Sequence, residues 1–178
     1  MTEPRIPPLP DGQWDDTIRD ALSPLLPEER RNPRDAGNVL ATLLRHPELT
    51  RGYLHFNAHL LQSSTLSPRI REVAVLRAVQ HRDCDYLWDH HLPIAERAGL
   101  SPADIDLVRA GDGADEVDRL VVQAVDEIDR SHTLGDDTWA ALRGHFDERQ
   151  LLDLLFTVGC YQSLAVAVNV LAVQPEHA

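Results

Sequence analysis

Side chains that can do chemistry lie close together in the middle of the sequence: a carboxylate, a thiol, a phenol and imidazoles. Cys84 follows Asp83, a predicted helix N-cap, and the unpaired N–H groups and dipole of a helix start favour a thiolate. His91 lies two helical turns later on the same face. An axial rise of about 10 Å separates it from Cys84, so water or another side chain would have to bridge them. Glu72 belongs to the preceding predicted helix, and a tight corner would fold it back over the Cys84 end.

Glu72, Cys84 and His91 are therefore the candidate catalytic residues, with Glu72 and His91 as an acid–base pair. Each also has a structural interpretation: a cysteine at a helix start is often a small buried residue, a glutamate among arginines is often an ion-pair partner, and a histidine pair often has one exposed and one packed ring. The direction of the Cys84 pKa shift stays open, because the helix start favours the thiolate and a nearby Glu72 opposes it.

A second constellation is the histidine pair His55 and His59, at i and i+4 of a predicted helix. This spacing can chelate a metal, with Glu72 or His91 completing the site. The preferred interpretation is that no metal binds and that His59 forms a wall of the substrate pocket, together with Tyr86 and Trp88. The apolar stripe expected to bury this helix consists of Leu49, Tyr53, Phe56 and Leu60.

The elements that must position these groups are predicted to be helices, because no run alternates as a strand does and apolar residues recur at helical spacing. Ser67-Pro68 and Ser101-Pro102 mark helix starts. We expect an all-α fold with a Pro-rich arm over residues 1–13 and one helical domain over 14–178. The predicted helices are Trp14–Leu22, Ala36–Arg45, Glu48–Ser63, Arg69–His81, Cys84–Ala98, a short one ending near Gly111, Ala114–Ser131, one around Trp139 and Glu148–Val173. Pro93 predicts a kink or an early break near Asp89.

Composition restricts the partners and the chemistry. The chain has 178 residues and a formal net charge of −12, and all 17 of its basic residues are arginine. The absence of lysine removes Schiff-base chemistry and a P-loop, and the negative charge argues against binding nucleic acid or an anionic membrane. Two cysteines cannot form a secreted disulfide framework, and the N-terminal residues lack the apolar core of a signal peptide, so we expect a cytoplasmic protein.

The last predicted helix, Glu148–Val173, is apolar on nearly every side. Its polar residues make burial more plausible than a membrane span. A helix without a polar face is normally buried centrally or between subunits. The sequence therefore predicts a homo-oligomer, with the Pro-rich arm reaching over a neighbour as a hypothesis.

The segments Leu66–Glu72 and Cys84–His91 resemble the carboxymuconolactone decarboxylase family, which includes the alkyl hydroperoxide reductase D proteins. The motif of that family is Glu, then Cys twelve residues on, Cys three later and His four after that. Glu72, Cys84 and His91 match three of these positions, whereas Leu87 stands where the second cysteine would be. The Pro-rich arm and the segments His46–Leu49 and Phe156–Gly159 also look like longer members of the family.

The resemblance implies an all-helical fold, a homo-oligomer (dimer, trimer or hexamer) and an enzyme of one of two branches. The peroxidase branch uses the Cys pair as peroxidatic and resolving thiols, and Leu87 cannot resolve a sulfenic acid, although an external thiol could. The decarboxylase branch needs only an acid–base pair, and Arg77 or Arg82 could hold a substrate carboxylate if neither is engaged in surface pairing.

We therefore expect a lyase of the carboxymuconolactone decarboxylase type, acting without a cofactor on a small cyclic or unsaturated carboxylic acid through Glu72 and His91. The alternatives are a thiol-dependent peroxidase with Cys84 as its single redox cysteine, and a non-catalytic oligomeric scaffold.

Overall fold

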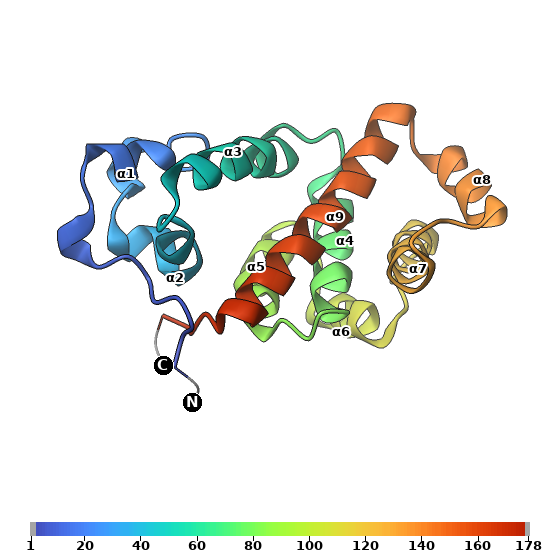
Figure 1. The fold of residues 1–178 in the computed structure, drawn as a ribbon. Helices are drawn as coiled ribbons and strands as arrows, with labels where there is room; N and C mark the ends of the chain where they lie inside the picture. Colours follow the sequence, from blue (N-terminus) through green and yellow to red (C-terminus); the bar gives the residue numbers. More distant parts are fainter. Residues whose placement is uncertain (1–2, 177–178) are drawn as a thin grey trace. The chain divides into compact units, whose positions relative to one another are not determined.

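The computed structural model describes residues 3–176, and within them the chain forms nine α-helices, three short helical segments of other types and no strand (Figure 1). This confirms the expected all-α fold. The chain divides into two compact units, one running to Ser63 and resuming at Ala167, the other spanning Ser64–Val166. Each unit is described by itself.

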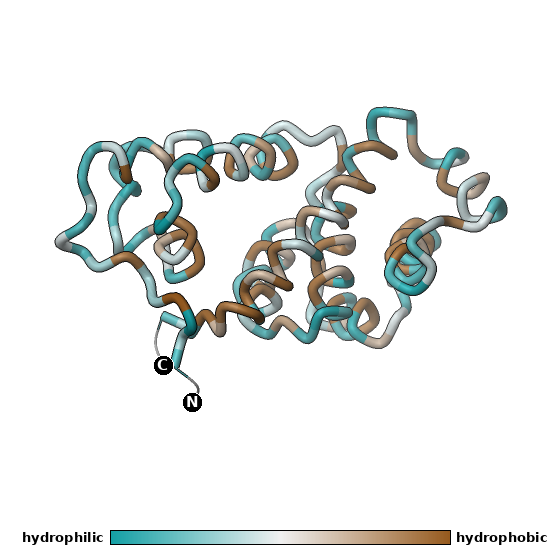
Figure 2. Tube along the Cα trace, in the orientation of Figure 1, coloured by the Kyte–Doolittle hydropathy of each residue, from teal (hydrophilic) through white to brown (hydrophobic). Residues whose placement is uncertain are grey.

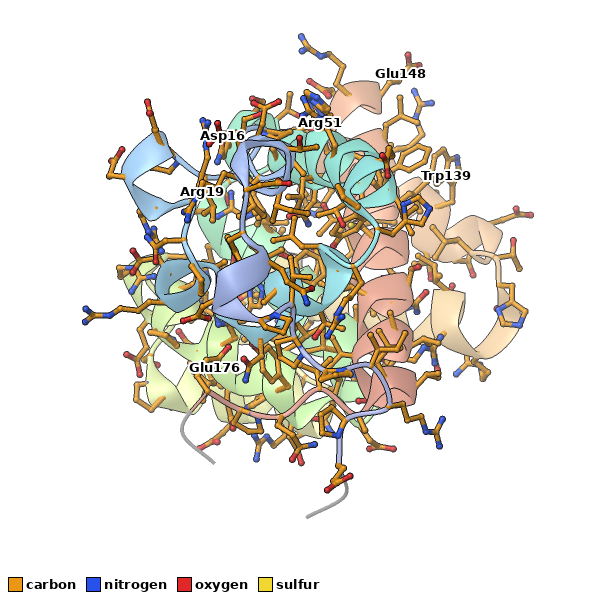
Figure 3. The ribbon with its side chains drawn as sticks, turned by 60° about the vertical axis from the view of Figure 1, so that its left-hand side comes forward. Asp16, Arg19, Arg51, Trp139, Glu148 and Glu176 are labelled. Atoms are coloured by element: carbon orange, nitrogen blue, oxygen red, sulfur yellow. The ribbon has the colours of Figure 1, made fainter. Side chains whose placement is uncertain are left out.

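The first unit is built from short capped helices around a small core. Asp15 and Asn32 accept hydrogen bonds from backbone N–H groups of the helices that they precede, as N-caps do. Its elements are η1 (Asp11–Gln13), α1 (Asp16–Ala21), η2 (Glu28–Arg30), α2 (Pro33–Leu43), α3 (Pro47–Ala58), the π-helical η3 (His59–Ser63) and the end of α9. The core contains Leu9, Trp14, Ala21, Leu22, Ala36, Ala41, Leu44 and Leu54. Figure 3 labels Asp16, Arg19 and Arg51 of this unit.

The Pro-rich arm lies against α2 within this unit. The Leu9 N–H donates to the Ala41 carbonyl at 2.8 Å, and the Trp14 indole N–H donates to the Leu9 carbonyl at 3.1 Å. Arg45 also donates to the carbonyls of Pro7 and Pro8. The arm thus has partners in its own chain, and its role toward a neighbouring copy stays a prediction.

The buried face of α3 differs from the expected stripe. Leu49 is 61% exposed and Phe56 is 40% exposed, whereas Leu54 is buried. The polar Thr50 is buried on this face because its hydroxyl donates to the His46 carbonyl at 2.9 Å. The prediction is confirmed for Leu60, which is buried, and for Tyr53, which packs against the core. It was wrong for Leu49 and Phe56, because a hydrogen-bonded threonine can occupy a core position that apolar spacing does not reveal.

The second unit is organised around α4 (Pro68–Gln80), which packs against α5, α6 and α7. Buried residues cover most of its circumference, which makes it a central helix. The other elements are α5 (Asp85–Arg97), α6 (Pro102–Ala110), α7 (Glu116–Ser131), α8 (Asp136–His145) and most of α9 (Glu148–Leu171). The expected caps are confirmed: Ser67 accepts from the Ile70 N–H, and Ser101 forms a capping box with Asp104.

The start and course of α5 differ from the prediction in two respects. Cys84 is itself the N-cap, and Asp83 instead closes the corner with a left-handed φ of 47°. The helix continues through Pro93 to Arg97, so the early break expected near Asp89 was wrong. Asp89 and Pro93 both lie on the exposed side, where water can bond the carbonyl that the proline leaves without a donor.

The long helix α9 has a buried and an exposed apolar face. Leu154, Val158, Tyr161 and Ala165 are buried, whereas Phe156 is 56% exposed. Figure 2 shows hydrophobic residues along its length. By length and composition alone α9 could cross a membrane, and 39% of its apolar window is buried in the structure. On the neighbouring α8, Trp139 lies at the surface with 38% of its area exposed (Figure 3).

Candidate active site

The hairpin of α4 and α5 brings Glu72 and His91 into direct contact. At its corner the Cys84 N–H donates to the Val79 carbonyl at 3.2 Å. Further from the corner, His91 Nδ1 lies 2.8 Å from Glu72 Oε2. The contacting pairs are Val79 with Cys84 and Glu72 with His91, so a lower number on α4 goes with a higher number on α5. The two helices therefore run antiparallel. Glu72 is 0% exposed and His91 is 4% exposed, so this dyad is shielded from bulk water.

The second carboxylate oxygen of Glu72 has its own partner. Arg71 Nε donates to Glu72 Oε1 at 3.1 Å, and the Arg71 side chain is only 13% exposed. A buried carboxylate is stable only with compensating charge or hydrogen bonds, and the guanidinium supplies both. Glu72 is therefore an ion-pair partner, as the structural interpretation expected, and also a partner of His91, while its catalytic role stays a prediction.

The His91 ring is held on one side by Glu72 and on another by Tyr161 of α9. The two ring centroids lie 4.9 Å apart at an interplanar angle of 89°, an edge-to-face contact. With Nδ1–H donating to the carboxylate, Nε2 is the nitrogen through which His91 can exchange a proton with another molecule. Tyr161 was not a candidate from the sequence, because its only local signal is a polar group within an apolar helix.

Cys84 lies at the start of α5 and is buried, with 2% of its area exposed. Burial raises the pKa of its thiol, the Leu87 backbone N–H that donates to the sulfur lowers it by less, and the charge of Asp85 adds to the rise. The structure thus decides the direction that the sequence left open. Leu87, at the position of the missing second cysteine, is also buried.

The three predicted substrate-contacting residues lie in different surroundings. Trp88 is on the buried face of α5 with His91, and the Arg109 guanidinium lies over its ring, 4.3 Å from the centroid. Tyr86 is half-buried and stacks on the exposed His90 at 6.4 Å. His59 is exposed at the start of η3, in the first unit. The second unit therefore brings Trp88 to the same helix face as the dyad, and the roles of His59 and Tyr86 stay predictions.

The arginines considered for a substrate carboxylate are already paired. Arg77 Nη2 donates to Asp126 Oδ2 at 2.9 Å, and Arg77 Nη1 donates to the Val108 carbonyl at the end of α6. Arg82 Nη1 lies 2.6 Å from Asp129 Oδ1. These contacts match the structural interpretation. No cluster of three or more His, Cys, Asp or Glu side chains suited to a metal ion occurs within residues 3–176.

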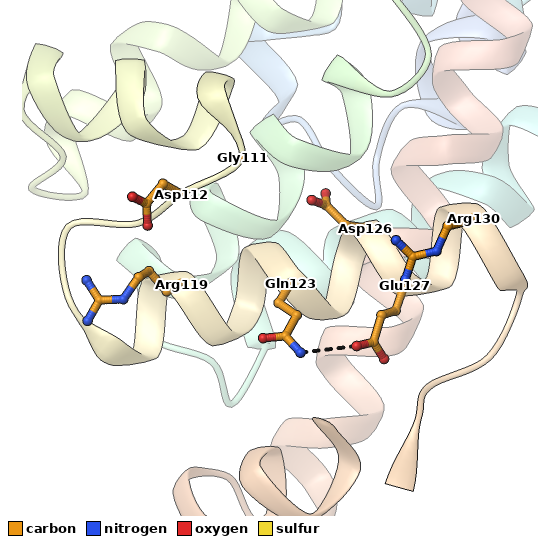
Figure 4. Close-up of a pocket in the computed structure, with 7 residues that line it drawn as sticks. All are labelled: Gly111, Asp112, Arg119, Gln123, Asp126, Glu127 and Arg130. Carbon is orange, nitrogen blue, oxygen red and sulfur yellow. Dashed lines mark hydrogen bonds between the residues drawn. The ribbon is translucent and has the colours of Figure 1, made fainter. Parts of the chain in front are cut away.

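A surface pocket of about 430 Å³ lies along α7 (Figure 4). Its lining consists of Gly111, Asp112, Arg119, Gln123, Asp126, Glu127 and Arg130. Its acidic groups serve the fold: Glu127 accepts hydrogen bonds from Thr138, Gln123 and the Gly135 N–H, and Asp126 accepts from Arg77. The pocket contains none of the candidate catalytic residues.

The segment that contains the hairpin is similar to a known protein family. Residues 47–127 match the model of the carboxymuconolactone decarboxylase family. Over this segment the chain is similar to the family. The matching segment contains Glu72, Cys84 and His91, so the carboxymuconolactone decarboxylase family match covers the whole α4–α5 hairpin.

Solved structures share the fold over nearly the whole chain. An uncharacterized peroxidase-related protein from Ralstonia eutropha JMP134, with an alkylhydroperoxidase AhpD core, is 19% identical with a TM-score of 0.79, and the match covers 98% of this chain and 94% of that one. A peroxidase-related protein from Silicibacter sp. TM1040 is 18% identical with a TM-score of 0.78, covering 99% and 95%. The apo debrominase Bmp8 is 12% identical with a TM-score of 0.70, covering 96% and 91%.

These similarities establish the fold and do not choose a reaction. Identities of 19%, 18% and 12% accompany different chemical descriptions, and one fold can carry unrelated activities. Among curated proteins, none matches the sequence significantly. The choice between these reactions therefore depends on the geometry of the Glu72–His91 site.

Proposed function

We propose that this protein is a carboxymuconolactone decarboxylase-like lyase that uses Glu72 and His91 to move protons on a small cyclic or unsaturated carboxylic acid. The observation that carries the proposal is the 2.8 Å contact between His91 Nδ1 and Glu72 Oε2 in a nearly dry setting. A carboxylate that fixes one imidazole nitrogen leaves the other correctly placed for acid–base work. The reaction needs no cofactor in this scheme.

In the proposed step the bond between the substrate carbon and its carboxylate breaks, and carbon dioxide leaves. The bonding electrons stay on carbon and spread into a neighbouring carbonyl group as an enolate. His91, protonated at Nε2, then gives its proton to that carbon, and Glu72 stabilises the imidazolium before the transfer. Water returns a proton to His91 and leaves as hydroxide, so the substrate loses carbon dioxide and gains one proton.

A thiol-dependent peroxidase is the second candidate, and the position of Cys84 at the same hairpin favours it. Its thiolate would attack the peroxide O–O bond and release an alcohol, leaving a sulfenic acid that an external thiol reduces. Two observations rank this candidate second: burial raises the pKa of Cys84, and Leu87 supplies no resolving thiol one turn away. Proton transfer by Glu72 and His91 needs neither a thiolate nor a second cysteine.

The test is a screen of cyclic and unsaturated carboxylic acids for carbon dioxide release, followed by variants assayed on the best substrate. We expect His91→Gln to lower kcat roughly 10²-fold to 10⁴-fold, the usual contribution of a positioned acid–base group. Glu72→Gln keeps the shape but not the charge, and we expect a smaller loss. The exposed neighbour provides the matched control, His90→Gln, which should retain turnover.

The competing chemistry is measured on the same proteins with an organic hydroperoxide and a dithiol reductant. Cys84→Ser should keep carbon dioxide release. Robust peroxide reduction that disappears in Cys84→Ser would reverse the ranking and make the protein a single-cysteine peroxidase. Circular dichroism of each variant confirms that the helices are intact.

A further inference from the structure

Two buried hydrogen-bonding groups close to the dyad have no partner among residues 3–176. They are the indole Nε1–H of Trp88 and the hydroxyl of Thr157. Trp88 is 3% exposed and Thr157 is 0% exposed. Because a buried donor without an acceptor costs free energy, such groups are rare in folded proteins and occur where a ligand or water completes them.

Both groups are one helical turn from the rings that meet at the site. Trp88 precedes His91 by three residues on the buried face of α5, so the two side chains are neighbours. Thr157 precedes Tyr161 by four residues on α9, and Tyr161 contacts His91 with ring centroids 4.9 Å apart.

The next turn of α9 fixes where Thr157 lies. Asp153, four residues before it, accepts a hydrogen bond from the Thr65 hydroxyl at 2.7 Å. The same face of α9 therefore contacts the segment leading into α4 at Asp153 and contacts His91 at Tyr161. Thr157 lies between these two contacts and so faces the α4–α5 hairpin.

The chemistry of the two groups selects an oxygen ligand. An indole N–H can only donate, and a threonine hydroxyl donates once. The Arg109 guanidinium lies over the Trp88 ring, which holds the indole in place and makes its N–H a stronger donor by drawing electron density from the ring. His91 lies one helical turn from Trp88 on the buried face of α5. Two donors next to a proton-transfer group suit a carboxylate, or the enolate oxygen that replaces it during reaction.

We propose that Trp88 Nε1 and Thr157 Oγ1 form the oxygen-binding subsite of the Glu72–His91 site, for the carboxylate or enolate oxygen of a small cyclic carboxylic acid. Thr157 is thereby a substrate-contacting residue. The inference deepens the proposed function and rests on it for the identity of the reaction, but the anion-binding role can be measured without turnover.

The first test uses the sign of a stability change. Thr157→Val removes a buried hydroxyl without a partner and keeps the volume, so the ligand-free variant should melt a few degrees higher than the wild type. Thr42→Val is the matched control, because Thr42 of α2 is another buried threonine whose hydroxyl has no partner among the described residues. It should also raise the melting temperature. A lower melting temperature for Thr157→Val would show a satisfied structural hydroxyl and overturn the proposal.

The second test measures binding of benzoate, a cyclic carboxylate that does not react. Titration with ¹⁵N-labelled protein should move one indole N–H resonance downfield, and Trp88→Phe should remove that resonance. Calorimetry should give a Kd for benzoate roughly 10-fold to 100-fold higher in Thr157→Val, the effect of losing one hydrogen bond to a charged group. Thr42→Val should bind as the wild type does.

The outcomes separate this inference from the proposed function. Unchanged benzoate binding in both Thr157→Val and Trp88→Phe, or no indole shift at millimolar benzoate, overturns the subsite. If His91→Gln still abolishes turnover in that case, the acid–base function stands. If the subsite variants lose benzoate while His91→Gln turns over normally, the subsite stands and the proposed chemistry falls.

Discussion

At the scale of residues, the site depends on how a buried carboxylate is satisfied. Glu72 accepts from Arg71 with one oxygen and contacts His91 with the other, while none of its surface is exposed. Breaking one side of such a buried group is costly because it leaves charge without compensation. These two contacts explain how the Glu72 carboxylate can be buried inside the hairpin.

The Cys84 thiol allows a prediction about pH. Burial raises its pKa, so the thiolate should appear only at a pH above that at which ordinary thiols ionise. In a Cys160→Ala background, the rate of alkylation by iodoacetamide should follow a pH profile with its midpoint above that of glutathione measured in parallel. A midpoint below that of glutathione would mean that the helix start outweighs burial, and would favour peroxidase chemistry.

At the scale of elements, charged contacts join α4 to its neighbours. Arg69 of α4 donates to Asp118 of α7 at 2.6 Å and to Asp104 of α6 at 3.2 Å, and Asp118 is 1% exposed. Near the other end of α4, Arg77 and His81 contact Asp126 of α7. Charged contacts thus attach α4 to α6 and α7 near its start and to α7 near its end.

The Asp126 contacts predict a pH-dependent stability. Burial alone would raise the pKa of Asp126, but hydrogen bonds from Arg77 and His81 outweigh it and leave the pKa below its usual value. A carboxyl whose pKa is lowered by folding contributes stability above its unfolded pKa, about 3.9, and loses it as the pH falls through the folded value. Asp126→Asn should therefore lower the unfolding free energy by about 1–3 kcal/mol at neutral pH.

The check is urea unfolding of wild type and Asp126→Asn at several pH values. The difference in unfolding free energy between the two proteins should shrink once the pH falls below the pKa of an ordinary aspartate carboxyl. Asp106, an exposed aspartate of α6, supplies the control Asp106→Asn, which should change little at any pH. A difference for Asp126→Asn that stays constant into acid would contradict the ion-pair explanation.

The turn before α7 depends on a glycine. A Cβ at Gly113 would lie 2.3 Å from the backbone N of Arg119 and 2.6 Å from the backbone carbon of Asp118. Backbone atoms of a packed helix cannot yield cheaply, so Gly113→Ala should destabilise the fold by about 1–3 kcal/mol, the usual cost of overpacking. Gly144→Ala in α8 meets nothing within 4 Å and should stabilise by roughly 0.5–1 kcal/mol. Thermal unfolding of the pair measures both signs, and equal melting temperatures would refute the steric argument.

At the scale of the whole molecule, α9 presents an apolar line to its surroundings. Leu152, Phe156 and Val166 are 55%, 56% and 47% exposed, and Val170 continues the line at 52%. With the exposed Gly159 and Ser163 included, the residues of this line are separated alternately by four and three positions. This is the spacing at which one helix packs along another in a coiled coil. We propose that this line is where copies of the chain associate into the homo-oligomer expected from the sequence.

Phe156→Glu tests that assembly, because a charge in the middle of an apolar contact opposes association. Light scattering at micromolar concentration should give an oligomeric mass for the wild type and a smaller mass for the variant. Trp139→Glu changes an exposed aromatic residue on α8 and should leave the mass unchanged. A monomeric wild type would end the proposal.

The sequence by itself determined the features that depend on residues close in the chain. The all-α class follows from helical spacing, and Ser67 and Ser101 act as caps because a cap bonds a backbone N–H three residues away. The short corner predicted that Glu72 folds back onto the next helix, but at the Cys84 end, whereas the structure places Glu72 against His91, two turns further on. The same local information misplaced the break at Asp89, since it could not show that Pro93 would lie on the exposed side.

Only the tertiary structure decided what surrounds these groups. Tyr161 contacts His91 although 70 residues separate them in the chain. Arg77 donates to Asp126 and is therefore already paired. Burial decides the direction of the Cys84 pKa shift. A hydropathy pattern tells which side chains tolerate burial, but not which neighbour covers them. Charge, desolvation and pKa act through space, so they exist only once distant segments pack together.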